Sequence, residues 1–155
     1  SSSVFEVIAW AFLSVDRIYQ ELCIINAIYT PINDSIETVK AWSKGLITMR
    51  IAKPAILSVH RLAKETKNVC EQALIHAIGQ GLSVVHTTQH ALGLCCYEIT
   101  ALLHQGSSTE MDTIITHQIN QYSQDLKTIR LTNPRYQQPW ASFIVQNRKP
   151  SIRRS

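Results

Sequence analysis

The stretch that decides the fold is residues 79–97, which read Gly-Gln-Gly-Leu-Ser-Val-Val-His-Thr-Thr-Gln-His-Ala-Leu-Gly-Leu-Cys-Cys-Tyr. It places Gln80, His86 and His90 inside an otherwise apolar region with helical spacing. An unpaired polar group in a protein interior costs about 1–3 kcal/mol, so such groups are seldom left without a partner. We therefore expect these side chains either to bond to one another in a core or to be presented to a ligand.

A helix break is expected in the middle of this stretch. Thr87 or Thr88 can act as an N-cap, which would end one helix and begin the next. Before the break, Gly79 and Gly81 remove two side chains and predict a close approach by another backbone or by a ligand. After the break, residues 90–103 are apolar on nearly every side, which predicts a central helix surrounded by others.

Helical periodicity continues outward in both directions, and the sequence has no strand-type alternation. The expected helices cover residues 4–27, a short segment around Trp42, residues 48–65, residues 69–85 and residues 109–130. Their expected end signals are an N-cap at Asn33-Asp34, a left-handed residue at Gly45 and a capping box formed by Ser107 and Glu110. The fold class is therefore predicted to be all-α, a single-domain bundle of five to six helices with a basic C-terminal tail.

Charge divides the chain into two parts. Residues 1–126 hold eight Lys and Arg against eleven Asp and Glu, a net charge of −3, whereas residues 127–155 hold seven Lys and Arg and no acid, a net charge of +7. The length of 155 residues suits one domain. We assign residues 1–130 to that helical domain and residues 131–155 to a basic, Pro-containing tail. The tail is expected to pack on the bundle through Trp140, Phe143 and Ile144 or to be partly disordered.

Composition and cysteine usage bear on the compartment. Apolar residues make up 45% of the chain and charged residues 17%, which is typical of a globular protein. Cys23, Cys70, Cys95 and Cys96 have neither CxxC nor zinc-ribbon spacing, and we expect them to be small core residues in a reducing compartment. The apolar opening, residues 4–13, is too short to span a membrane. A cytoplasmic location is therefore expected.

The polar residues of the stretch predict a hydrogen-bonded cluster across two helices. His90 and Tyr97 share one face of the second helix with Gly93, while Gln80 and His86 come from the first. Such a cluster would hold the two helices in register or form the floor of a pocket. If the two histidines are buried and paired, replacing either with alanine should cost about 1–3 kcal/mol of stability. Trp42 and Tyr97 are also expected to be core anchors.

A metal site or a hydrolytic site is the alternative that the histidines allow. His86 and His90 have the i, i+4 spacing of a helical metal pair, but the glutamate of a HExxH motif is not present between them. A catalytic zinc needs three protein ligands, so a third would have to come from tertiary folding. The candidates for that ligand are His60, His76 and Glu98. No pattern in the chain calls for a cofactor.

Several short motifs occur in an order and spacing that is similar to a known family. They are Ile36-Glu37, Ala41-Trp42, Gly45, His60-Arg61-Leu62-Ala63-Lys64-Glu65, Gly79-Gln80, His86, His90-Ala91-Leu92-Gly93 and Tyr97. Over residues 5–105 the chain resembles an all-helical immunity-protein family of bacterial polymorphic toxin systems. It departs from the family pattern at Thr30-Pro31-Ile32, where an acidic-Arg-Pro step is usual, at His76, where Arg is frequent, and at Thr88, where proline is usual.

The resemblance implies a small cytosolic protein, encoded beside a toxin, that neutralises its cognate toxin by binding and occlusion rather than by catalysis. The mildly acidic body suits a basic toxin domain such as a nuclease, because complementary charge speeds encounter. No membrane partner is expected, and direct nucleic-acid binding is expected only if the basic tail supplies it. We interpret residues 79–97 as a packing and hydrogen-bonding junction between two central helices, with the working surface elsewhere on the bundle.

Overall fold

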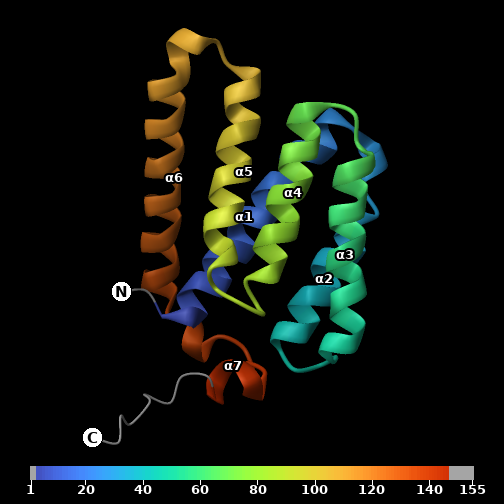
Figure 1. Ribbon diagram of the computed structural model, residues 1–155. Coiled ribbons are helices and arrows are strands. Elements are labelled where there is room, and N and C mark those ends of the chain that lie inside the picture. The colour runs from blue at the N-terminus through green and yellow to red at the C-terminus, as the bar shows by residue number, and fades with distance from the viewer. Residues whose placement is uncertain (1–2, 147–155) are drawn as a thin grey trace, which may run out of the picture.

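The computed structural model describes residues 3–146 and arranges them as a helical bundle (Figure 1). Its α-helices are α1 (Val4–Ile25), α2 (Ile32–Ser43), α3 (Met49–Glu65), α4 (Val69–Ser83), α5 (His90–Gln105), α6 (Met111–Thr132) and α7 (Ser142–Gln146). The 3-10 helices are η1 (Ala27–Tyr29), η2 (Ser108–Glu110) and η3 (Pro134–Tyr136). The described residues contain no strand, which agrees with the predicted all-α class. Seven α-helices exceed the expected five to six, since the five-residue α7 forms inside the segment expected as a tail.

The central helix is α4, and the prediction that residues 90–103 form it is wrong. α4 packs against α1, α3 and α5, and Figure 1 shows it between α5 and α3. Nine of its residues are buried, whereas α5 buries only Leu94, Glu98 and Ala101. The apolar residues of α5 outnumber those that its neighbours cover, and Leu92 remains 72% exposed. Helical periodicity shows which faces of a helix are apolar, but it does not show how many of those faces other helices cover.

The helix ends follow most of the local signals. Gly45 has φ +75°, the left-handed conformation that ends α2, and Ser107 and Glu110 form both bonds of the expected capping box. The N-cap expected at Asn33-Asp34 is wrong, because α2 already begins at Ile32, directly after Pro31. Pro31 has φ −59°, a value that already suits a helix start.

Residues 133–146 pack across one end of the bundle. The backbone N–H of Ala141 donates to the carbonyl of Ser43 over 2.8 Å, and Ile144 is buried. The ring of Trp140 lies 5.2 Å from that of Phe5 at the start of α1. The part of the expected tail within the described residues is therefore packed, while its residues 147–155 lie outside them.

We expected the four cysteines to be small core residues, but none of them is fully buried. Cys23, Cys70 and Cys95 are partly exposed, Cys96 is exposed, and all four are free thiols. Cys96 lies on the part of α5 that its neighbours leave uncovered. Among residues 3–146, no helix has the length and apolar character needed to cross a membrane.

Candidate functional site

A pocket opens between α2, α3 and the connection from α4 to α5, and we call it the histidine pocket. Its volume is about 280 Å³. The residues that line it are Trp42, Met49, Lys53, Ile56, Leu57, His60, Ser83, His86 and His90. Both histidines of the 79–97 stretch therefore face a surface cavity.

The connection between α4 and α5 places these two histidines. α4 ends at Ser83, whose hydroxyl donates to the carbonyl of Gly79 over 2.8 Å. The backbone N–H of His86 then donates to the carbonyl of Ser83, and the chain turns before α5 begins at His90. The predicted helix break is confirmed, but the N-cap position is taken by Gln89 rather than by a threonine.

His86 lines the histidine pocket and is exposed. Its ring stacks on that of Trp42, with centroids 6.5 Å apart and planes 24° apart. Trp42 is buried, and the ring of Phe143 also stacks on it with a centroid distance of 5.3 Å. A structural role for His86 would require the ring to be buried, and it is not. Trp42 is the core anchor that we expected.

His90 and Gln80 meet across the helix pair. The Nδ1 atom of His90 lies 2.8 Å from Oε1 of Gln80. Because an amide oxygen only accepts, Nδ1 carries the proton, and in the neutral ring Nε2 is left as an acceptor. Gly93 makes room for this contact, since a Cβ atom there would collide with the Gln80 side chain. The structure thus brings Gln80, His90 and Gly93 together.

Tyr97 joins a different pair of histidines from the one we expected. The Nδ1 atoms of His60 and His76 lie 3.3 Å apart, and the ring of Tyr97 stacks on His76 at 4.8 Å. Burial is the largest cause that lowers the pKa of His60, followed by the neighbouring charges of His76, His90 and Lys64. Burial also lowers the pKa of His76, with a further contribution from Lys64. Gly79 leaves space for the His60 ring, which a Cβ atom there would strike.

Glu98, one of the candidates for a third metal ligand, lies instead in a buried polar network that was not predicted from the sequence. Arg17 donates to both carboxylate oxygens, over 2.6 and 3.1 Å. Gln118 and the Tyr122 hydroxyl both donate to Oε1, over 3.0 and 2.8 Å. Burial and the Glu98 charge raise the pKa of Tyr122. Two signals in the sequence pointed to this site: a carboxylate at Glu98 inside an apolar helix, and the spacing of Gln118 and Tyr122, one turn apart on α6.

The metal alternative needs three converging ligands, and residues 3–146 bring no three His, Cys, Asp or Glu side chains together in that way. The two oxygens of Glu98 accept four hydrogen bonds between them from Arg17, Gln118 and Tyr122. Of the other candidates, His60, His86 and His90 line the pocket, while His76 does not line it and contacts His60.

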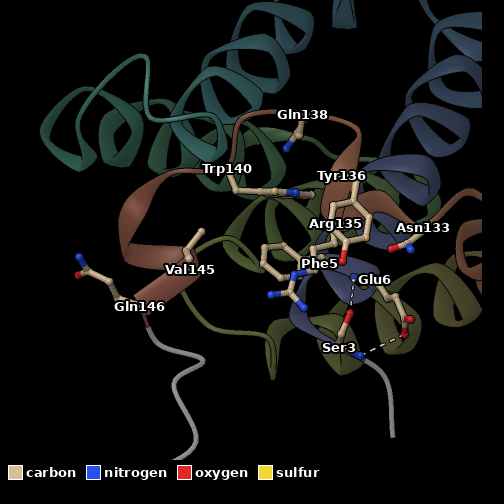
Figure 2. Close-up of a pocket in the computed structure, with 10 residues that line it drawn as sticks. All are labelled: Ser3, Phe5, Glu6, Asn133, Arg135, Tyr136, Gln138, Trp140, Val145 and Gln146. Atoms are coloured by element: carbon tan, nitrogen blue, oxygen red, sulfur yellow. Dashed lines mark hydrogen bonds between the residues drawn. The ribbon is translucent and has the colours of Figure 1, made fainter.

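A second cavity, of about 800 Å³, lies between the start of α1 and residues 133–146. Figure 2 shows Arg135 beside Phe5, and its guanidinium carbon is 5.9 Å from the centre of that ring. Glu6 and Trp140 also line this cavity, and none of residues 79–97 does. It is therefore separate from the histidine pocket.

The comparisons with known proteins point to one family. A family model described as "Imm-5 like putative immunity protein" matches residues 2–125, which include α1 to α5, most of α6 and every residue of the histidine pocket. Comparisons with curated proteins and with solved structures find no match. The family match covers most of the chain and agrees with the motif resemblance found in residues 5–105. The chain therefore belongs to the Imm-5 like immunity-protein family.

Proposed function

We propose that this protein binds a cognate bacterial toxin and neutralises it by occluding its working surface, without catalysing a reaction. The observation that carries the proposal is the family match over residues 2–125. The free thiols of all four cysteines support an encounter in the cytoplasm, because reducing conditions keep thiols free.

We infer that the histidine pocket contributes to the toxin-binding surface. His86 contributes an exposed polar ring to the lining of the pocket. Met49 and Leu57 contribute apolar side chains to it, with exposed fractions of 47% and 51%. Buried anchor side chains surrounded by a polar rim are the usual arrangement of a protein interface. A side chain of the toxin inserted between these three residues would lose its hydration water on binding.

The target we propose is a basic toxin domain such as a nuclease. The net charge of −3 over residues 1–126 supports this choice, because long-range attraction between opposite charges speeds association. Association with such a target should slow as salt concentration rises. A rate that does not depend on salt would contradict a basic target while leaving toxin binding itself intact.

The test is co-expression with the product of the adjacent gene. We expect that product to arrest growth alone, growth to recover when this protein is present, and the two purified proteins to form a complex. His86→Ala should weaken the complex without changing the melting temperature, since His86 is exposed. His117→Ala, which removes an exposed histidine from α6, is the matched control and should change neither. An adjacent product that neither arrests growth nor binds would overturn the proposal.

A further inference from the structure

The outward face of α3 carries a row of cations. Arg50, Lys53, Leu57, Arg61 and Lys64 follow one another at intervals of three, four, four and three residues, so they share one face of the helix. All five are exposed. We call these five residues the α3 face. At a rise of 1.5 Å per residue, the row from Arg50 to Lys64 is about 21 Å long.

The four cations of the α3 face have no acidic partner within the described residues. The ion pairs of that part of the chain use Arg17, Lys40 and Arg130. The only acid on α3 is Glu65, its last residue, so the helix carries a net charge of +3 in a body whose net charge is −3. Like charges one turn apart repel each other. This face therefore concentrates positive charge that the protein itself does not neutralise.

The α3 face adjoins the histidine pocket and shares Lys53 and Leu57 with it. None of the residues that line the pocket is acidic, and its walls combine the Lys53 cation and imidazole nitrogens with apolar side chains. A partner that fits this surface has an apolar side chain for the pocket and carboxylates for the cations of the α3 face. The length of the row corresponds to about six residues of extended chain or about fourteen residues of helix.

We infer that the α3 face and the histidine pocket together bind an acidic segment of the toxin. An apolar side chain of that segment enters the pocket, and its Asp and Glu carboxylates lie along the four cations. The inference rests on the proposed function and adds the chemistry of the contact. It is compatible with a toxin of net basic charge, because charge contacts at an interface act within a screening length of about 10 Å and a basic domain can carry an acidic segment.

Charge reversal on the α3 face tests the inference, with the adjacent-gene product as the probe. Lys53→Glu and Arg61→Glu should each weaken the complex about tenfold or more in low salt, because each places a carboxylate against the acidic segment. Lys127→Glu makes the same charge change on α6, at the opposite side of the bundle, and should alter the affinity less than twofold (Figure 1). The difference between the reversals and this control should shrink at high salt.

Two further variants keep the result interpretable. Lys53→Gln only removes a charge and should give a smaller loss than Lys53→Glu, and Leu57→Ala should weaken binding with little salt dependence. Thermal melting confirms that each variant is folded, which we expect because the altered side chains are exposed.

The outcomes separate this inference from the proposed function. If wild-type protein binds the probe but the two reversals behave like Lys127→Glu, the toxin contacts another surface and the inference is wrong, while the proposed function stands. If the reversals strengthen the complex, the contacting segment is basic and the inference is again wrong. If wild-type protein does not bind the probe, both proposals fail.

Discussion

The Nδ1 atoms of His60 and His76 lie 3.3 Å apart, between α3 and α4. At this distance one ring donates its proton and the other accepts it, so the accepting ring must be neutral. Burial and nearby positive charges lower the pKa of both rings. The fold thus holds two histidines close together in an environment that makes protonation of either ring less favourable.

The first prediction is that acid destabilises the protein through this pair. The unfolded chain binds protons at the ordinary histidine pKa of about 6.5, whereas the folded protein resists protonation because both pKa values are lowered. Stability is therefore fully present above pH 6.5 and is lost as the pH falls through the lowered values. Urea unfolding between pH 7.5 and 5 should show this loss, and His76→Gln should reduce it more than His117→Gln does. Equal slopes in the two variants would contradict the assignment.

The second prediction concerns the buried carboxylate of Glu98. Replacing it with alanine leaves Arg17 without its partner in a partly buried site, which should cost about 3 kcal/mol, the lower end of the range for a broken buried pair. Glu37→Ala removes an exposed carboxylate from α2 and should cost less than about 1 kcal/mol. Denaturant unfolding measures both. A loss of similar size in the two variants would mean that the network contributes little to stability.

The third prediction concerns the two glycines that face polar side chains. Gly79→Ala should push the His60 ring aside, and Gly93→Ala should displace Gln80 from His90. Gly79→Ala should destabilise the protein by about 1–3 kcal/mol despite the better helix propensity of alanine. Gly93→Ala should cost less, because the end of the flexible Gln80 side chain can rotate away from the new methyl group. Gln124→Ala at an exposed position of α6 serves as the control for propensity alone. If either glycine variant were as stable as this control, close packing would not be the reason for the glycine.

The fourth prediction separates two neighbouring thiols. Burial, as the largest cause, raises the pKa of Cys95 to about 11, so this thiol is almost entirely protonated at neutral pH. Cys96 is exposed. Iodoacetamide at pH 7.5 should therefore alkylate Cys96 well before Cys95, as peptide mass spectrometry of the native protein would show. In Cys96→Ser, labelling of this pair should almost disappear, and rapid labelling of Cys95 there would contradict its burial.

Local signals were sufficient for most of the secondary structure. The left-handed conformation of Gly45 and the capping box at Ser107 each depend on a few neighbouring residues, and the sequence contains those residues. The break after α4 was predicted as well, although Gln89 rather than a threonine takes the N-cap position. The start of α2 was misplaced because Pro31 fits a helix start as well as Asn33-Asp34 fits a cap. Competing signals of similar strength make such boundaries hard to assign.

The candidate site was predicted only in part. The contact between Gln80 and His90 follows from their places on two adjacent helices, and Gly93 is consistent with it. The pairing of His76 with His60 involves a helix from an earlier part of the chain, and no spacing within α4 indicates it. The role of Glu98 likewise depends on Arg17, which is 81 residues away.

The sequence by itself determined that the chain is helical, where most of its helices end and which family its motifs resemble, because periodicity, caps and motif spacing are local properties. Only the tertiary structure decided that α4 rather than α5 is central, that His86 is exposed beside Trp42, and that the cations of α3 adjoin the histidine pocket. The physical reason is that burial and charge neutralisation depend on which helix faces meet, and those meetings join residues far apart in the chain.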